Sequence, residues 1–329
     1  MTCRLLAAIT FLLATNSIAF AVDTGQANID AFINEMVSEH DYDRATLEEI
    51  LGEAEFKESI IEQISKPAER TLTWADYRPI FMTKERVTAG AKFWRENRAA
   101  LERVSNETGV PVEIMVGIIG VETYYGRITG GHRVVDALTT LAFYYPPREK
   151  FFRSELREFL LLVREEDMQA TDAFGSYAGA MGRPQFMPSS YRAYAVDSTG
   201  DSKRDIWNNW TDVAGSIANY FVAHKWRTGE EVTTQATLSE RFTGPTPKNQ
   251  LSADETVNSL SESGVMFSTS LGNDSAAQLV TLEGDAGPEY WVGFHNFFVI
   301  TRYNRSVMYA LAVHQLGQEI ALEVARDKS

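Results

Sequence analysis

One acidic side chain in an apolar stretch is the first candidate for chemistry in this sequence of 329 residues. Residues 110–126 read VPVEIMVGIIGVETYYG, and Glu122 stands near the end of that run. A carboxylate at the edge of an apolar wall loses solvation, which disfavours its charged form and lets it hold a proton near neutral pH. Glu122 is therefore a candidate general acid. The competing interpretation is a glutamate that turns toward solvent at the last turn of a helix.

The residues around Glu122 predict the helix that would position it. Pro111 suits the first helical position, and Gly126 is a candidate C-terminal cap. Apolar side chains follow the i, i+3, i+4 spacing of a buried helix face at Val112, Met115, Ile118 and Ile119. The stretch is expected to form a core helix with Glu122 near its end.

A polar loop after residue 196 carries a pattern of oxygen ligands that suits calcium. Side-chain oxygens at loop positions 1, 3 and 5 come from Asp197, Thr199 and Asp201. A backbone carbonyl at position 7 and a later acid would complete the set, from Lys203 and from Asp205 or Asp212. A standard loop has Gly where Ser202 stands and Glu where Asn208 stands. The competing interpretation is a polar turn that caps a helix.

Aromatic and amide side chains suit a sugar chain as ligand, because ring C–H faces stack on aromatic rings and hydroxyls need directional partners. Tyrosines occur at Tyr124, Tyr125, Tyr144, Tyr145, Tyr303 and Tyr309. Glycines interleaved with Gln, Met, Phe and Pro in residues 176–190 indicate a backbone that comes close to a ligand. The competing interpretation is that these tyrosines are ordinary core and surface residues.

Several catalytic chemistries have no matching motif. The five histidines are scattered, and none has the H-E-x-x-H spacing of a zinc protease. The chain has neither a G-x-S-x-G elbow nor a phosphate-binding glycine loop. Its one cysteine, Cys3, lies in front of the N-terminal apolar run. Serine-hydrolase, nucleotide and thiol chemistries are not expected, and the reaction is expected to need no cofactor.

Residues 1–21 are typical of a secretory signal peptide. Arg4 precedes an apolar run from Leu5 to Leu13, and Ala19-Phe20-Ala21 is a small-residue cleavage sequence. Cleavage is expected before Val22. The mature protein is then expected in the periplasm without a membrane anchor, because no later stretch is long and apolar enough. The formal net charge of −14 argues against nucleic acid as a partner.

Periodicity predicts a mainly helical chain that contains a short β region. Helical spacing covers residues 29–36, 47–54, 83–106, 149–169 and the chain beyond 304, with an interruption at Pro67 and 73–79. Asp136 is a good N-cap for another helix, which Pro146-Pro147 ends. Short alternating runs from 228 to 290, then YWVGF at 290–294 and NFFVIT at 296–301, predict antiparallel strands. The expected fold class is α+β, mainly α.

Four separate motifs follow one another along the chain. They read IIGVETYYG at 118–126, AGAMGRPQFMPSSY at 178–191, GSIANYF at 215–221 and FVITRYNRSVMY at 298–309. Together they resemble the bacterial lytic murein transglycosylase B family over about residues 29–316, in the family's order. The resemblance implies a lysozyme-like helical core of the goose type, braced by a helical N-terminal domain and joined to a small β domain. The corresponding domains are 22–83, 84–227, 228–293 and a return to the core at 294–329.

The resemblance also implies roles for residues in the glycan site. Glu122 matches the family's single catalytic acid, and Gln185 matches a residue that lines the site beside it. Residues that face the glycan match Tyr303, Asn304 and Tyr309, and Tyr124 beside the acid is a further candidate. Where the family commonly has Pro-Arg-Arg, this chain has Pro146-Pro147-Arg148. Arg148 is therefore expected to face the substrate, and the second arginine is missing.

The family's calcium loop maps to residues 197–212. Its ligands correspond to Asp197, Thr199, Asp201, the Lys203 carbonyl and Asp212. This chain has one extra residue between Trp207 and Asp212. A structural Ca²⁺ ion is the expected occupant.

The reaction implied by the resemblance is non-hydrolytic cleavage of the β-1,4 bond between N-acetylmuramic acid and N-acetylglucosamine, which leaves 1,6-anhydro ends. Glu122 would act as acid and then as base, with the substrate's acetamido group in place of a second carboxylate. Glycan strands of peptidoglycan are the expected partner, and proteins of cell-wall synthesis or remodelling are further candidates. Two alternatives stay open: a hydrolytic muramidase that uses the same acid, and a non-catalytic peptidoglycan-binding scaffold.

Overall fold

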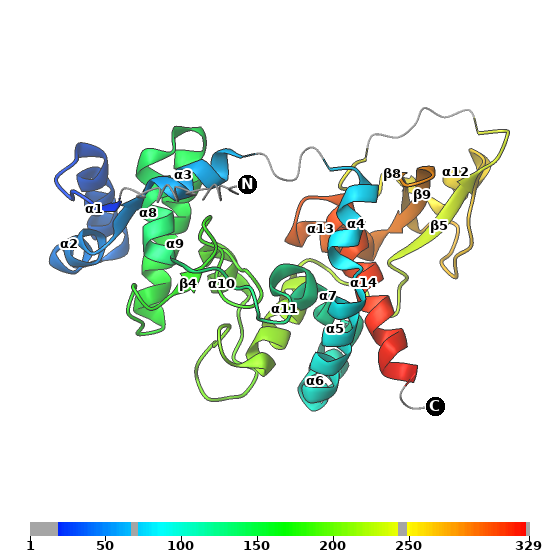
Figure 1. Cartoon of the computed structure of the whole chain (residues 1–329), viewed down its shortest axis with the longest axis horizontal. Coiled ribbons are helices and arrows are strands. Elements are labelled where there is room, and N and C mark those ends of the chain that lie inside the picture. The colour runs from blue at the N-terminus through cyan, green and yellow to red at the C-terminus, as the bar shows by residue number, and fades with distance from the viewer. Residues whose placement is uncertain (1–18, 67–71, 243–248, 327–329) are drawn as a thin grey trace, which may run out of the picture.

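Helices dominate the computed structural model of the chain, which describes residues 19–66, 72–242 and 249–326. A small antiparallel sheet lies at one end of the molecule, on the right of Figure 1. The expected class, α+β and mainly α, is confirmed. The expected signal peptide lies outside the described residues except for 19–21, which form strand β1 (Ala19–Ala21).

The N-terminal helices pack against a helical pair from the middle of the chain. They are α1 (Ala27–His40), α2 (Arg44–Gly52) and α3 (Glu58–Ser65), with β2 (Glu55–Lys57) pairing with β1. The helical faces predicted for the first two are confirmed, since Ile29, Phe32, Ile33, Met36, Leu47 and Leu51 are all buried. Their neighbours are α8 (Val134–Tyr144) and α9 (Glu149–Glu165), on the left of Figure 1.

The segment predicted to interrupt the helices at 73–79 is itself helical. Helix α4 (Trp74–Phe81) begins at a capping box between Thr73 and Asp76 and contains Pro79. The two reciprocal side-chain bonds satisfy backbone donors at the helix start, which outweighs the proline in the second turn. Helix α4 contacts α14 (Val307–Arg326) and strand β8 (Ala276–Gly284), so it lies far from α1–α3 (Figure 1).

The single helix predicted for residues 83–106 is wrong. The structure has two helices, α5 (Lys84–Glu96) and α6 (Arg98–Thr108), separated at Asn97. The Asn97 side chain donates to the Phe93 carbonyl at 2.9 Å, as does its backbone N–H at 3.1 Å. Asparagine offers the backbone such local bonds in place of the helical ladder, which explains the break.

The predicted core helix is α7 (Val112–Thr123), and its crossing with α14 organises the centre of the fold. Its apolar residues are buried on nearly every side, as expected for Val112, Met115, Ile118 and Ile119. Gly117 and Gly317 let the two helices approach closely. A Cβ on Gly117 would lie 2.5 Å from the Val313 carbonyl oxygen, and one on Gly317 2.3 Å from that of Glu113. This contact aligns Glu122 with the first turns of α14.

No single described helix is long and apolar enough to cross a membrane, and α6 and α7 meet that test only as a pair bent by 118°.

Helix α8 begins earlier than predicted, so Asp136 is not its N-cap. The chain enters it from β3 (His132–Arg133), which pairs with β4 (Phe174–Gly175). Asp136 is 2% exposed in the first turn, where it forms an ion pair with Arg133 and accepts the Glu55 N–H at 2.9 Å. Its carboxylate therefore ties α8 to the N-terminal segment. The predicted end of the helix at Pro146-Pro147 is confirmed by the short 3₁₀ turn η1 (Pro146–Arg148).

The predicted β piece forms a five-stranded antiparallel sheet in the order β6-β8-β9-β5-β7. The remaining strands are β5 (Thr233–Leu238), β6 (Glu255–Thr256), β7 (Val265–Met266) and β9 (Gly287–Phe294), with α12 (Val257–Glu262) beside them. This sheet has a small core of its own, separate from the main one.

The predicted strand at 296–301 is wrong, because these residues belong to α13 (His295–Tyr303). All six are buried. A short apolar run that is buried throughout does not reveal by its periodicity whether it is helix or strand. The remaining helices are α10 (Pro188–Tyr194) and α11 (Trp210–Ala223).

Candidate active site

Glu122 and Tyr309 meet where α7 ends and α14 begins. Glu122 is the next-to-last residue of α7 and is half-buried. The Tyr309 hydroxyl donates a hydrogen bond to Glu122 Oε1 at 2.5 Å, and the Tyr309 side chain is 2% exposed. Burial raises the pKa of Tyr309 well above its usual value, and the negative charge of Glu122 adds to the effect. Tyr309 therefore stays protonated and orients the carboxyl group.

The backbone directly after Glu122 is held in an uncommon conformation. Tyr124, Tyr125 and Gly126 all have positive φ angles, of 49°, 59° and 81°. The C-cap of α7 is Tyr124, so the prediction of Gly126 as its C-terminal cap is wrong. A non-glycine residue with positive φ costs about 1–3 kcal/mol and persists only where its surroundings enforce it.

Contacts from several elements enforce this turn. The Thr123 hydroxyl donates to the Arg183 carbonyl at 3.1 Å and accepts from the Gly126 N–H at 3.2 Å. Arg86 of α5 donates to the Gly120 carbonyl at 2.5 Å and stacks on the Tyr124 ring, with its guanidinium carbon 4.3 Å from the ring centroid. The backbone that carries Glu122 is thus fixed from both sides.

The structure brings Tyr303 to the same place. Its hydroxyl donates to the Pro184 carbonyl at 2.6 Å, and its ring stacks on that of Tyr309 at 6.5 Å with 12° between the planes. Burial raises the pKa of Tyr303 well above its usual value, with a further contribution from the Glu122 charge. Asn304 follows at the end of α13 and is half-buried.

Gln185, next to Pro184, has a positive φ of 54°. Its side-chain Nε2 donates to the carbonyls of Thr129 and Gly182, at 3.0 and 2.8 Å. Both donor hydrogens of the amide are therefore used, while Oε1 has no donor among the described residues. A fixed acceptor of this kind suits the N–H or hydroxyl of a sugar.

Arg148 and Tyr124 have other neighbours. Arg148 is exposed in η1, and its guanidinium lies over the rings of Phe151 and Phe152, at 4.2 and 4.9 Å. The Tyr124 ring is contacted by Arg127 at 4.7 Å as well as by Arg86. Their roles in substrate binding stay predictions.

Two groups of supporting residues could not be identified from the sequence motifs. Arg86 belongs to no motif, and nothing in its local sequence indicates that it reaches Gly120. Tyr220 lies inside the motif GSIANYF without an assigned role. The structure places its ring 4.9 Å from that of Tyr303, and Phe186 packs against both at 5.8 Å. These two rings pack against the ring of Tyr303.

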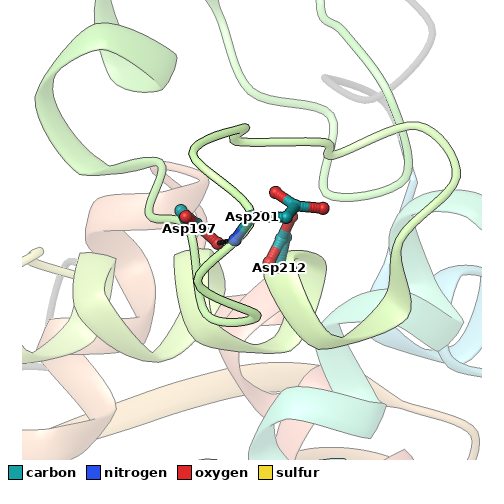
Figure 2. A group of neighbouring side chains, drawn as sticks. All are labelled: Asp197, Asp201 and Asp212. Atoms are coloured by element: carbon teal, nitrogen blue, oxygen red, sulfur yellow. Dashed lines mark hydrogen bonds between the residues drawn. The ribbon is translucent and has the colours of Figure 1, made fainter.

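Three acidic side chains converge on the predicted calcium loop, as Figure 2 shows. Carboxylate oxygens of Asp197, Asp201 and Asp212 all lie within 4.8 Å of one another. Asp212 is fully buried in the first turn of α11 and accepts the N–H groups of Ser198 and Asp205 at 2.9 and 3.1 Å. Burial and the charges of Asp197 and Asp201 raise the pKa of Asp212, against the lowering effect of those two N–H bonds.

Oxygen-rich surroundings of this kind fit a hard cation, which would relieve the repulsion between the carboxylates. The Thr199 hydroxyl lies at the same cluster, 3.2 Å from Asp197 Oδ1 and 3.4 Å from Asp212 Oδ1. Lys203 is tied to the loop by its N–H bond to Asp201 at 2.9 Å. Asp205 instead accepts the N–H groups of Trp207 and Asn208, so of the two candidate acids the structure selects Asp212.

Comparison with known proteins identifies the class of protein that has this fold and this site. The family model described as the transglycosylase SLT domain matches residues 24–318. The chain belongs to this lytic transglycosylase family. It is 42% identical over 304 residues to membrane-bound lytic murein transglycosylase B of Escherichia coli (strain K12). The matched region covers 90% of this chain and 83% of that protein.

Solved structures agree with this placement. The catenated lytic transglycosylase SltB1 from Pseudomonas aeruginosa is 46% identical, with a TM-score of 0.87 over 91% of this chain and 99% of that one. The Escherichia coli lytic transglycosylase Slt35 in complex with calcium is 41% identical, with a TM-score of 0.83 over 93% and 96%. SltB3 from Pseudomonas aeruginosa in complex with NAG-NAM-pentapeptide is 28% identical, with a TM-score of 0.77 over 89% and 78%.

Proposed function

We propose that the protein is a periplasmic lytic transglycosylase that cleaves the β-1,4 bond between N-acetylmuramic acid and N-acetylglucosamine in peptidoglycan without water. The observation that carries the proposal is Glu122, held by Tyr309 at the end of a buried helix. Two relatives support peptidoglycan as the substrate class: one is a lytic murein transglycosylase, and the other, SltB3, is in complex with NAG-NAM-pentapeptide. The hydroxyl of Tyr309 bonds to Glu122, and the family resemblance, which assigns one catalytic acid, favours a mechanism with one carboxylate.

In the first step Glu122 is the acid. Its proton passes to the oxygen that leaves with N-acetylglucosamine while the bond from that oxygen to the muramoyl anomeric carbon breaks. The carbonyl oxygen of the 2-acetamido group attacks the same carbon and closes an oxazolinium ring. Gln185 Oε1 and Asn304 hold the sugar in the geometry for this attack, and such positioning lowers the barrier by removing the entropy cost of alignment.

In the second step Glu122 is the base. Its carboxylate takes the proton of the C6 hydroxyl, and the C6 oxygen attacks the anomeric carbon. The oxazolinium C–O bond breaks, which restores the acetamido group and leaves a 1,6-anhydro ring. Glu122 ends the cycle protonated, as it began.

A Ca²⁺ ion fits the loop as a structural element. Asp197, Thr199, Asp201, the Lys203 carbonyl and Asp212 would hold it, and the calcium complex of Slt35 supports this assignment. The ion would fix the entry of α11 and would take no part in bond cleavage.

Digestion of purified sacculi in heavy-oxygen water, read by mass spectrometry of the released muropeptides, tests the reaction. We expect unlabelled 1,6-anhydro-muramoyl ends and no new reducing ends. Label at the muramoyl ends would show that water attacks, and the protein would then be a muramidase.

The variant Glu122→Gln tests the assignment of the acid. The amide keeps the size of the side chain but has no acidic proton, so turnover should fall by about 10²–10⁴-fold or more. Melting curves of the variant serve as the control for folding. Near-normal release of anhydro-muropeptides by a folded variant would remove Glu122 from the mechanism and favour the scaffold alternative.

A further inference from the structure

Residues 182–184 receive hydrogen bonds from several of the side chains that surround Glu122. Their three carbonyl groups each accept a side-chain bond from a different part of the site. In chain order, the Gly182 carbonyl accepts from Gln185 Nε2 at 2.8 Å, the Arg183 carbonyl from the Thr123 hydroxyl at 3.1 Å, and the Pro184 carbonyl from the Tyr303 hydroxyl at 2.6 Å. Thr123 directly follows Glu122 in the chain. The place of this short segment therefore determines where three side chains of the site lie.

The Arg183 side chain ties this segment to the residues that lead into α11. Its guanidinium carbon lies 3.8 Å from the centroid of the Trp210 ring, and Nη1 donates to the Asn208 carbonyl at 3.0 Å. The Arg183 backbone N–H donates to the Ile206 carbonyl, also at 3.0 Å. A guanidinium can stack on a ring and donate at the same time, because its donors lie in the plane of the group. Trp210 is the first residue of α11, so the anchor is a helix start.

The stacked pair of Arg183 and Trp210 also packs against the turn that follows Glu122. A Cβ on Gly126 would lie 3.0 Å from the Trp210 ring and 3.4 Å from Arg183 Nε. Gly126 has a φ of 81°, and its N–H donates to the Thr123 hydroxyl at 3.2 Å. Arg183 therefore borders this turn at two points, with its side chain near Gly126 and with its carbonyl at Thr123.

We propose that Arg183 is a positioning residue for bond cleavage, which holds residues 182–184 against α11 so that their carbonyls fix the turn after Glu122 and the Tyr303 hydroxyl. This inference rests on the proposed function, because it takes Glu122 as the acid that is positioned. Arg183 acts through the backbone of its own segment and does not touch the sugar. Its anchor residues Ile206, Asn208 and Trp210 are not among the proposed calcium ligands, so assays in millimolar calcium measure its effect separately.

The variant Arg183→Met tests the proposal, with Arg164→Met as the matched control. Arg164 makes the same two kinds of contact elsewhere: its guanidinium carbon lies 4.7 Å from the Tyr42 ring centroid, and Nη1 donates to the His40 carbonyl at 2.9 Å. We expect Arg183→Met to lower kcat on soluble glycan strands about tenfold with little change in KM, because misplaced catalytic groups weaken the transition state selectively. Arg164→Met should leave kcat unchanged. Arg183→Lys keeps the charge and a donor without the planar fork, so it should restore part of kcat.

A double-mutant cycle with Thr123→Val tests the route of the effect. Thr123→Val removes the hydroxyl that joins the end of α7 to the Arg183 carbonyl. In that background Arg183→Met should lower kcat several-fold less than in the unmodified protein, because the two residues share one path. Arg164→Met should combine with Thr123→Val additively. An unchanged kcat in folded Arg183→Met, or additive effects of Arg183→Met and Thr123→Val on kcat, would overturn the proposal. If Arg183→Met does not fold, Arg183→Lys takes its place in the same cycle.

Melting temperatures of the same variants separate a positioning role from a structural one. Coupling between Arg183 and Thr123 in stability alone, with additive effects on kcat, would assign Arg183 to folding and overturn the proposal. Coupling in kcat supports it. Release of labelled reducing ends by the unmodified protein would refute the proposed transglycosylase reaction, whereas the cycle on kcat would still report whether Arg183 positions Glu122 in a muramidase.

Discussion

The proton that Glu122 transfers is useful only if its carboxyl group points at the bond that breaks, and Tyr309 is the side chain that orients it. Tyr309→Phe removes the 2.5 Å hydrogen bond while keeping the buried ring. We expect turnover to fall about tenfold or more, as is usual when a hydrogen bond to a charged group is lost. Steady-state kinetics on sacculi measures this.

Tyr42→Phe is the matched control for that variant, because the Tyr42 hydroxyl, in the segment between α1 and α2, donates to the Leu160 carbonyl of α9 at 2.8 Å, away from the site. It should lower stability without changing turnover. Equal turnover losses in both variants would mean that Tyr309 acts only through folding.

His314, a half-buried residue of α14, gives a prediction about acid stability. Burial lowers its pKa from 6.5 to about 4, and its Nδ1 has no hydrogen-bond partner among the residues that the structure describes. Between these values the unfolded chain binds a proton that the folded chain does not. The stability that depends on an uncharged His314 is therefore fully present above pH 6.5, and it is lost as the pH falls toward about 4.

His314→Leu removes this titration, so the melting temperature of the variant should fall less than that of the unmodified protein between pH of about 7 and about 5. Parallel pH profiles for the two proteins would show that His314 takes up no proton on unfolding. Carboxylates that titrate in the same range contribute equally to both proteins and cancel in the comparison.

At the scale of elements, the crossing of α7 and α14 determines the distance between Glu122 and Tyr309. Gly317→Ala would place a methyl group 2.3 Å from the Glu113 carbonyl oxygen and force the helices apart. We expect a loss of about 1–3 kcal/mol in stability, typical of overpacking, together with reduced turnover. Gly52→Ala is the control, since a Cβ there meets nothing within 4 Å. A stable and fully active Gly317→Ala would show that the crossing adjusts freely.

The elements also show which features of the fold and the site can be predicted from the sequence alone. The helix around Glu122 and the acidic loop were predictable, because each depends on residues close together in the chain. The break at Asn97, the left-handed Tyr124 and the helical α13 were not, because side-chain bonds and tertiary burial decide them. Local spacing also carries no information on Tyr309, which is 187 residues from Glu122. Its placement at the site came from the family resemblance.

For the molecule as a whole, calcium is expected to act on stability more than on catalysis. The ligands lie in the loop and at the start of α11, whereas Glu122 lies at the end of α7. An ion that binds only the folded state at about 100 times its Kd adds about 2.7 kcal/mol. Melting temperature should thus rise with calcium while turnover changes little.

Asp212→Asn is the control for that measurement, because it removes one negative ligand and keeps the shape of the buried side chain. The calcium-dependent rise in melting temperature should shrink in this variant. Identical melting curves with chelator and with millimolar calcium would exclude an ion in the loop.

The partnership of α7 with α14 also bears on when lytic activity first arises. A ribosome makes the chain from its N-terminus, so Glu122 is complete long before α14 exists. Tyr309 and Gly317 both belong to the last stretch to be made. A nascent or prematurely terminated chain has the acid but not the side chain that orients it. The order of synthesis thereby delays the activity of a wall-cleaving enzyme until its final helix is in place.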